Sequence, residues 1–409
     1  MLIVYIIFLY SMIKVSYAQT VYGQKEIDAV VNCLKKGTQM GEHASLFESK
    51  VAALFNQKYG LFVNSGSSAL YLGMESSNFP AGSEIITPAL TFSTTVGSIL
   101  KNNITPVFVD VGESDYCIDV NLIENAITDK TVAIMAPNLM GNICDWQTVS
   151  DLAKKYNIKV IEDSADTLGG TINNKPSGSY SDWSITSFYG SHIINCAGNG
   201  GMLCINDEKI YKKAKLLRSW GRSSSLFDDQ SEKIENRFNI KLDDIDYDAK
   251  FVFEEIGYNL EGSEIGAAFG LKQLEDLDNN IAIRKSNFQR QTDFFNSYDE
   301  FFIVPQQTPN SDSAWLAYPI LIRDNHLFSR KEFQIFLEKR DIQTRVVFTG
   351  NITRQPGFAD KPHKISSKLT NSDKVMSDGV LLACHHGLTN EMFDHMHATI
   401  SDFIKSKNL

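Results

Sequence analysis

The sequence has too few basic residues for several classes of protein. Lys and Arg number 39 against 49 Asp and Glu, which gives a formal charge of −10, and no long basic run is present. Such a chain is a poor candidate for duplex nucleic acid or for an anionic membrane surface. It also lacks internal repeats and low-complexity tracts, and 43% of its residues are hydrophobic. Disordered and fibrous proteins are therefore excluded.

Cysteine is scarce, and no Cys-x-x-Cys pair is present. The six cysteines are scattered over the chain, at positions 33, 117, 144, 196, 204 and 384. This spacing predicts reduced, buried thiols and not a disulfide or zinc framework. His385 and His386 are adjacent, but neighbouring residues of a strand point apart, and no carboxylate has ligand spacing to them. We therefore predict no metal site.

The chain also lacks an apolar run long enough to cross a bilayer. Residues 1–19, MLIVYIIFLYSMIKVSYAQ, hold about ten consecutive apolar residues, which are too few for a membrane span. They end in Ser-Tyr-Ala before Gln19, as a signal peptide would, but no positive charge precedes the apolar run. Met12 is a second candidate start. The residues themselves leave a signal peptide and an upstream extension both open.

Short β-branched runs alternate with helical patterns through the first half of the chain. This alternation predicts an α/β fold, with a mostly parallel sheet and helices on both of its faces. The expected strands cover 59–64, 84–88, 106–111, 132–137 and 159–163. The expected helices cover 26–34, 44–55, 68–74, a segment ending near 100, 120–127 and 146–156.

The second half of the 409-residue chain is organised differently. A polar, acidic excursion at 223–250 interrupts the pattern, and a long helix is expected from 263 to about 298. Strands at 315–322 and 344–348, with two or three helices, then indicate a smaller α+β domain. Since domains hold roughly 100–200 residues, we predict an extension at 1–12, a large domain at 13–270 and a small one at 271–409.

Two local signals point to a phosphate-bearing, charged ligand. The turn Asn64-Ser65-Gly66-Ser67-Ser68 joins an expected strand to a helix, where backbone N–H groups and hydroxyls form a phosphate cradle. Serine also caps helices that bind nothing. Asp163 ends an expected parallel strand, at the edge where such sheets bind ligands. It would pair with a protonated ring nitrogen or cap the next helix.

His192 and Phe92 each have both a functional and a structural interpretation. His192 lies between the Ser/Gly turns of SFYGSH and GNGG, where it is either an acid–base group or a structural histidine. Phe92, in PALTFSTT, is placed either to stack on a planar ring or to fill the core.

Taken together, the motifs resemble those of the DegT/DnrJ/EryC1/StrS family, whose members use pyridoxal phosphate (PLP) on nucleotide-linked sugars. The resemblance runs from about Val15 to the C-terminus. It rests on the segments NSGSSAL, ITPALTFSTT, NLMGN, IEDSAD, SFYGSHI, GNGGML and IGYNLEGSEIGAAFGLKQLE. It implies a fold-type-I large domain, a small C-terminal domain and a homodimer with active sites at its interface. Because it includes the Ser-Tyr-Ala, cleavage there would cut into the domain, and we expect a cytoplasmic protein with residues 1–11 dispensable or mis-started.

The resemblance also implies roles for individual residues. Asp163 matches the carboxylate that pairs with the pyridine nitrogen and keeps the ring able to accept electrons. The other implied cofactor contacts are Ser67, Ser68 and Ser187 at the phosphate, Phe92 on the ring, Asp166 near the ring hydroxyl, and Asn259 donated to the phosphate by a partner subunit.

One departure from the family pattern decides the predicted reaction. Aminotransferases of the family carry a Schiff-base Lys three residues after the Tyr of SFY, but this chain has His192 there. Imidazole has no primary amine, so it transfers protons instead. The replacement resembles the sugar 3-dehydratases, which remove the C3 hydroxyl of 4-keto-6-deoxyhexoses with PLP in its amine form, pyridoxamine phosphate (PMP). His192 would be the acid–base group. The alternatives are an aminotransferase and a non-catalytic sugar-binding protein.

The sugar 3-dehydratases that this sequence resembles form two branches. One holds a [2Fe–2S] cluster on four cysteines, but this chain has Ala165 and 223–226 (SSSL) where those ligands would stand, so we expect no cluster. The other branch, which includes GDP-4-keto-6-deoxymannose 3-dehydratase, regenerates PMP with L-glutamate. The chain resembles this branch in its cofactor chemistry. The candidate groups for the diphosphate or for glutamate are Arg218, Arg222, Arg237, Arg345 and Arg354.

Overall fold

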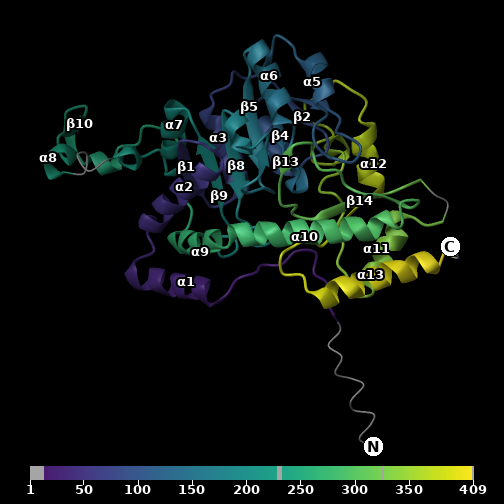
Figure 1. Ribbon diagram of the computed structural model, residues 1–409. Coiled ribbons are helices and arrows are strands. Elements are labelled where there is room, and N and C mark those ends of the chain that lie inside the picture. Colours follow the sequence, from purple (N-terminus) through teal and green to yellow (C-terminus); the bar gives the residue numbers. More distant parts are fainter. Residues whose placement is uncertain (1–12, 228–232, 325–326, 408–409) are drawn as a thin grey trace, which may run out of the picture.

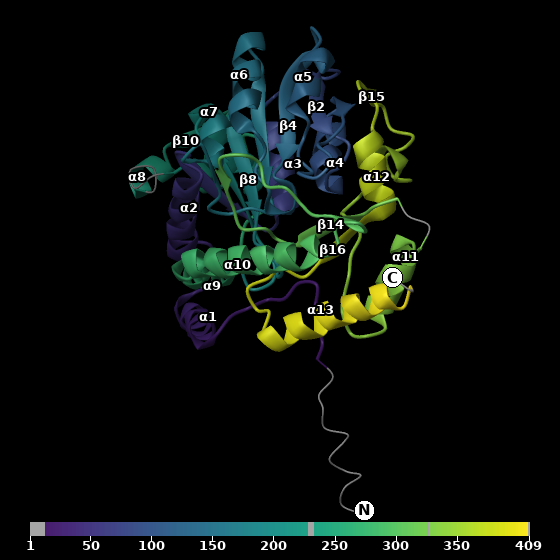
Figure 2. The same ribbon diagram turned by 45° about the vertical axis from the view of Figure 1, so that its right-hand side comes forward.

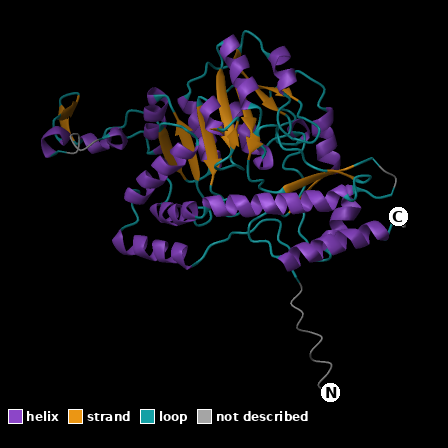
Figure 3. Ribbon diagram, in the orientation of Figure 1, coloured by secondary structure: helices purple, strands orange, loops and turns teal. Residues whose placement is uncertain are grey.

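A computed structural model describes residues 13–227, 233–324 and 327–407, and its centre is an eight-stranded sheet (Figures 1 and 3). The strand order is β1-β9-β8-β5-β4-β2-β3-β15. In this order the strands span Tyr59–Val63, Gly201–Ile205, Trp183–Ser187, Lys159–Ser164, Thr131–Pro137, Glu84–Pro88, Thr105–Val109 and Lys364–Ile365. The five strands predicted in the first half of the chain are confirmed.

The sheet is parallel except for β9, which pairs antiparallel with both β1 and β8. The carboxyl ends of β1, β2, β4, β5 and β8 therefore meet at one edge of the sheet. Strands buried on both faces are continuous apolar runs, and here β2 and β9 are buried along their whole length. The edge where the strands end is where an open α/β sheet binds its ligand.

Helices cover both faces of this sheet, as predicted. One core packs α3 (Gly66–Ser76), α4 (Ser93–Lys101) and α7 (Glu208–Arg218) against the strands. The core on the other face contains α5 (Val120–Ala126) and α6 (Trp146–Tyr156). The first helices of the chain, α1 (Gln24–Lys36) and α2 (Glu42–Leu54), pack against α9 (Glu264–Glu275).

The C-terminal part of the chain forms a second core around a three-stranded antiparallel sheet. This sheet contains β12 (Phe302–Ile303), β14 (Tyr318–Ile322) and β16 (Gly379–Leu382). Its helices are α10 (Leu277–Asn296), α11 (Arg330–Glu338), α12 (Thr370–Asp378) and α13 (Asn390–Lys405). Both ribbon views show α10 passing along the lower edge of the large sheet, with α13 beneath it (Figures 1 and 2).

Two expectations for the C-terminal half are wrong. The long helix expected over 263–298 is two helices, α9 and α10, because the backbone leaves the helical region at Asp276. The strand expected over 344–348 is absent from this described segment, which makes a single bridge, between Arg345 and Leu381. Its β-branched residues favour a strand, but the chain turns, and Phe348 adopts a left-handed φ of 43°.

The acidic excursion leaves the body of the molecule, at the left of Figure 1. Its described part contains the short helix α8 (Ile234–Arg237) and a hairpin of β10 (Ile240–Leu242) and β11 (Ile245–Tyr247). A separate small sheet has β6 (Thr171–Ile172) at its centre, paired antiparallel with β7 (Lys175–Pro176) and with β13 (Ser311–Asp312).

The first described residues form a strap across the C-terminal core. Val15 is fully buried there and bridges to Ile342, and the Ser16 carbonyl accepts a hydrogen bond of 3.0 Å from His385 Nε2. The predictions about residues 1–12 lie outside the described residues. Within the described ranges, no helix is long and apolar enough to cross a membrane.

Candidate active site

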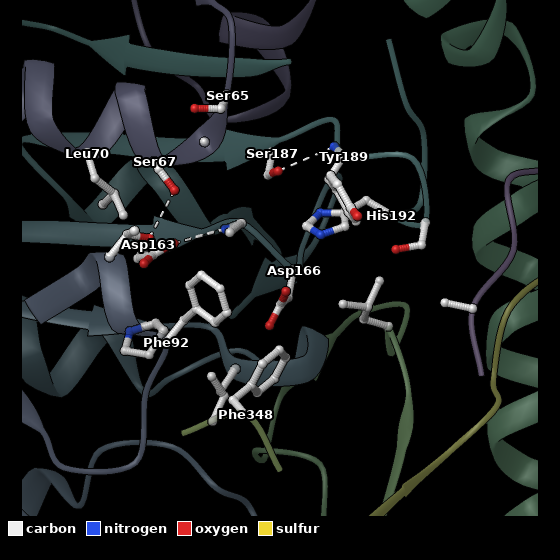
Figure 4. A pocket seen from close by; sticks show the side chains of 18 of the residues that line it. Ser65, Ser67, Leu70, Phe92, Asp163, Asp166, Ser187, Tyr189, His192 and Phe348 are labelled. Atoms are coloured by element: carbon white, nitrogen blue, oxygen red, sulfur yellow. Dashed lines mark hydrogen bonds between the residues drawn. The ribbon is translucent and has the colours of Figure 1, made fainter. Parts of the chain in front are cut away.

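The loops at the carboxyl edge of the large sheet enclose a cavity of about 350 Å³ (Figure 4). This volume is within the range of small-molecule sites, roughly 300–1,000 Å³. The cavity walls include Ser67, Phe92, Asp163, Asp166 and His192. Residues that the sequence separates by more than a hundred positions therefore line one space, as the motif interpretation requires.

The Gly/Ser turn after β1 forms the N-terminus of α3 at one end of this cavity. Ser65 caps the helix by accepting the Ser68 N–H at 3.1 Å, and Ser67 Oγ donates to Thr94 Oγ1 at 3.1 Å. Ser65, Gly66 and Ser67 line the cavity. Ser68 is one step deeper in the helix, where its hydroxyl donates to Asn64 Oδ1 at 2.6 Å, and it is not among the cavity-lining residues.

Asp163 is the second-last residue of β5, and its carboxyl group faces the cavity. It is 3% exposed, and Oδ2 accepts a hydrogen bond from Thr95 Oγ1 at 2.7 Å while Oδ1 accepts the Ala165 N–H at 3.1 Å. Burial raises the pKa of this carboxyl group, and its two hydrogen bonds act against that rise. A cationic ligand group at Asp163 would favour the ionised form.

His192 lies in the loop between β8 and β9, on the same side of the cavity as Tyr189 (Figure 4). Its Nδ1 atom is buried and has no hydrogen-bond partner among the described residues. Burial lowers the pKa of His192 to about 4, and the positive charge of Arg284 acts in the same direction. The imidazole is therefore neutral at physiological pH and available as a base.

Two phenylalanines form the opposite wall of the cavity. Phe92 meets Phe348 edge to face at 6.0 Å between ring centroids (Figure 4). Phe92 is 48% exposed, so it is not the plain core residue that one interpretation of the sequence allowed. Phe348 comes from the segment that was expected to be a strand; its backbone is left-handed, and the residue lines the cavity.

Sequence reasoning also missed two tyrosines of the cavity. Tyr17 reaches it from the N-terminal strap, and Tyr189 from the SFY motif, where it meets His192 edge to face at 6.0 Å. Tyr189 lies within a motif already singled out, so the motif could have indicated it. Tyr17 has no signal beyond its place in the segment SYAQ.

Arginine is absent from the described cavity lining, and so is lysine. Arg218 is buried in an ion pair with Glu48 at 2.7 Å, and Arg354 pairs with Asp373. Arg237 pairs with Asp248 on the excursion. Arg345 lies close to the cavity, 5.5 Å from the ring centroid of Tyr17.

The remaining candidates lie on the segment that leads to and from the excursion. Arg222 lies over the ring of Trp220 at 4.6 Å, beside a separate polar pocket. Asn259 is exposed, and its backbone bridges to Ser219. Both residues therefore lie outside the cavity of their own chain.

The six cysteines are buried free thiols, as predicted. His385 and His386 serve separate structural contacts, because His386 Nδ1 accepts a hydrogen bond from Arg284 Nε at 3.2 Å and His385 binds the strap. The described ranges contain no cluster of His, Cys, Asp or Glu that could hold a metal ion.

The cavity residues fit PLP. The N-terminus of α3 and the hydroxyls of Ser67 and Ser187 suit a phosphate, and Phe92 suits a flat ring. Asp163 is a buried carboxyl group on which no cation of the described residues acts, so it suits a protonated pyridine nitrogen. The Nδ1 atom of His192 is buried and has no hydrogen-bond partner among the described residues, so it is open to a hydrogen bond with a bound ligand.

Comparisons with known proteins identify the family of this chain. Residues 21–401 match the DegT/DnrJ/EryC1/StrS aminotransferase family. The lipopolysaccharide biosynthesis protein RfbH of Salmonella typhimurium is 34% identical over 394 residues, which are 94% of this chain and 90% of that protein. The dTDP-4-dehydro-2,6-dideoxy-D-glucose 3-dehydratase of Saccharopolyspora spinosa is 32% identical over 89% of this chain and 80% of its own length.

Solved structures also resemble this one. GDP-4-keto-6-deoxy-D-mannose 3-dehydratase of Escherichia coli, solved with bound hydrated PLP, superposes with a TM-score of 0.85 at 26% identity over 95% of this chain and all of that chain. Another structure of a GDP-4-keto-6-deoxymannose 3-dehydratase holds a trapped PLP–glutamate geminal diamine. The fold is therefore the fold-type-I architecture that the sequence predicted.

Proposed function

Because the chain belongs to the DegT/DnrJ/EryC1/StrS aminotransferase family, we propose that it is a 3-dehydratase that uses PLP and PMP on a nucleotide-linked 4-keto-6-deoxyhexose. The observation that carries this proposal is His192, a buried neutral imidazole in a cavity whose described lining contains no lysine. The resemblance to named 3-dehydratases and to RfbH supports a place in deoxysugar and lipopolysaccharide synthesis.

The cofactor, when bound, supplies an electron-accepting ring and a reactive amine. His192 takes up and returns the proton at the reacting carbon, which requires the neutral imidazole that its buried position favours. Asp163 keeps the ring nitrogen protonated. Phe92 holds the ring in place, and Tyr17 closes the cavity from the strap.

A substitution at Gly66 tests whether the turn after β1 holds the cofactor phosphate. A Cβ atom there would lie 2.8 Å from Ser187 Cβ, so Gly66→Ala pushes the cradle and Ser187 apart. We expect PLP binding about 5- to 150-fold weaker by spectroscopic titration, since overpacking costs about 1–3 kcal/mol. Gly357→Ala is the matched control, because a Cβ there meets nothing within 4 Å. Equal affinity of both variants would show that the cradle does not hold the phosphate.

A nucleotide diphosphate needs cations, and the described cavity lining of one chain contains no lysine or arginine. In our proposal Arg345 acts from the rim, while Arg222, Arg237 and Asn259 of one subunit serve the cavity of the other in a homodimer. The excursion and the segment that follows it support this arrangement, because they expose large apolar side chains. Ile234 and Ile245 of the excursion are 72% and 67% exposed, and Ile256 after it is 95% exposed. Apolar residues this exposed mark an interaction surface.

The regeneration of the amine form is proposed to use L-glutamate and no iron–sulfur cluster. Ala165 lies in the cavity wall, where the cluster-bearing branch places its first cysteine, and 223–226 likewise offer no thiolate. The PLP–glutamate adduct in a related structure supports glutamate as the amino donor.

Product analysis tests the function directly. Purified protein with PLP and glutamate is incubated with a panel of GDP-, CDP- and dTDP-linked 4-keto-6-deoxyhexoses, and the products are weighed by mass spectrometry. We expect a 3-deoxy keto sugar, one oxygen atom lighter than its precursor. An amino sugar would instead identify an aminotransferase, and binding without turnover would identify a non-catalytic sugar-binding protein.

A further inference from the structure

The cavity contains two carboxyl groups, Asp163 and Asp166, without a lysine or arginine in its described lining. Two neighbouring carboxylates in a buried space repel one another, so one of them tends to retain its proton. Asp163 has two hydrogen-bond donors to stabilise its charge, Thr95 Oγ1 and the Ala165 N–H. Asp166 accepts fewer hydrogen bonds than Asp163, so Asp166 is the carboxyl group of this pair that we expect to keep its proton.

The carboxyl group of Asp166 is held at one oxygen. Oδ2 accepts the N–H of Met140 at 2.9 Å, and the described residues offer no further hydrogen bond to this group. Met140 is itself fixed in a left-handed conformation, with φ 57°. In Figure 4 the Asp166 side chain reaches into the space that it shares with His192 and Phe348. Its second oxygen is therefore available to a ligand.

The groups that face Asp166 come from several parts of the chain. They are Asp163 on the same segment, His192 from the loop after β8, and Tyr17 from the strap, with Arg345 and Arg284 beyond Tyr17. Burial raises the pKa of Asp166 to about 7, and the charge of Asp163 adds to the rise. The pKa of His192 moves the other way, to about 4. Between about pH 4 and pH 7, the proton is therefore expected on the carboxyl group and not on the imidazole.

We propose that Asp166 is a second catalytic residue, the general acid that protonates the departing C3 hydroxyl while His192 acts as the base. This inference rests on the proposed 3-dehydratase function. A pair of titratable groups whose surroundings drive their protonation apart is the arrangement that acid–base catalysis requires.

The elimination balances with these two residues. His192 accepts the proton that leaves the reacting carbon of the cofactor, and the electron pair of that bond is delivered through the conjugated system to C3. The C3–O bond breaks, and its electron pair leaves on oxygen. Asp166 gives its proton to that oxygen, so that water departs instead of hydroxide. The two electrons that reach C3 come from the amine form of the cofactor, which would be spent in the step and restored by L-glutamate. Solvent returns the proton from His192 to Asp166.

The protonation state of Asp166 has its own test, which needs no turnover. Infrared difference spectra of wild type minus Asp166→Asn, without substrate, should show the carbonyl stretch of a protonated carboxyl group at pH 6 and its loss by pH 9. Asparagine still accepts the Met140 N–H, so the variant retains the local fold. A carboxylate signal already present at pH 6 would overturn the proposal.

The catalytic role is tested with a better leaving group. For Asp166→Asn we expect about 10²-fold slower elimination from the natural substrate, since general acid catalysis contributes about 10²–10⁴-fold. A 3-fluoro analogue should restore the rate of this variant, because fluoride leaves without a proton, but should not restore that of His192→Asn. In the wild type the rate should fall about tenfold per pH unit above pH 7, as the acid form is lost, and the Asn variant should lack this fall.

The outcomes separate this proposal from the function on which it rests. An unrescued Asp166→Asn, or one with the wild-type pH profile, overturns only the general acid. A wild-type enzyme that forms no 3-deoxy product overturns both proposals, while the infrared experiment still reports which residue holds the proton.

Discussion

His192→Asn is expected to slow formation of the 3-deoxy product by about 10²–10⁴-fold, the range that a proton-transfer residue contributes. The amide is close to the imidazole in size but cannot accept a proton from carbon. The Nδ1 atom of His192 has no hydrogen-bond partner among the described residues, so the variant should fold normally and bind PLP with nearly unchanged affinity. A fall in the rate constant with an unchanged dissociation constant for PLP is the expected signature, measured by single-turnover product analysis and by titration.

A second substitution at this position tests why lysine is absent. In His192→Lys, borohydride should attach the cofactor covalently to the chain, whereas the wild type should release it all on denaturation. His395→Asn is the control, because this imidazole lies on α13 outside the cavity and contacts the Arg340 carbonyl. Borohydride trapping of the cofactor on any lysine of the wild type would contradict the role of His192.

The strands could be predicted from sequence because their signal is local. Runs such as 84–88 and 132–137 are buried on both faces, so burial and β-propensity coincide in them. The errors come from segments in which tertiary structure overrides propensity. The residues 344–348 are β-rich, yet they turn at Phe348 to line the cavity, and a helical pattern over 263–298 does not reveal the break at Asp276.

The residues of the site also fall into those that local sequence could predict and those that depend on tertiary packing. Ser67, Phe92, Asp163 and His192 stand in motifs at strand ends, so topology alone brings them to one edge of the sheet. Tyr17 and Phe348 reach the cavity because the strap and the C-terminal core pack against that edge, and such contacts leave no periodic pattern in the sequence. The described cavity lining has no arginine for a similar reason. Arg218, Arg237 and Arg354 lie on segments near the motifs, but each forms an ion pair with a carboxylate elsewhere. The sequence does not show these tertiary contacts.

Asp163, which we propose to pair with the ring nitrogen of the cofactor, is the other position where a large effect is expected. In Asp163→Asn the side chain keeps its shape and one acceptor oxygen, so either the Thr95 hydroxyl or the Ala165 N–H remains bonded to it. The buried negative charge is lost, and with it the reason for the ring nitrogen to stay protonated. We expect about 10²–10³-fold slower turnover, as for the loss of one preorganised electrostatic group in an active site.

Affinity for PLP should fall less than the rate, by about 10–100-fold, since a hydrogen bond to a charged group contributes about 1.5–3 kcal/mol. The nitrogen of ¹⁵N-labelled PLP distinguishes this effect from simple misfolding: it should stay protonated across neutral pH in the wild type and lose its proton in Asp163→Asn.

Glu162→Gln is the matched control, because Glu162 is the adjacent buried carboxyl group of β5, is held by Asn138 and Ser164, and does not line the cavity. If both variants bind PLP and turn over like the wild type, Asp163 does not control the ring. If Asp163→Asn alone loses turnover while its ring nitrogen stays protonated, another acid holds that proton, and Asp166 becomes the group to replace next.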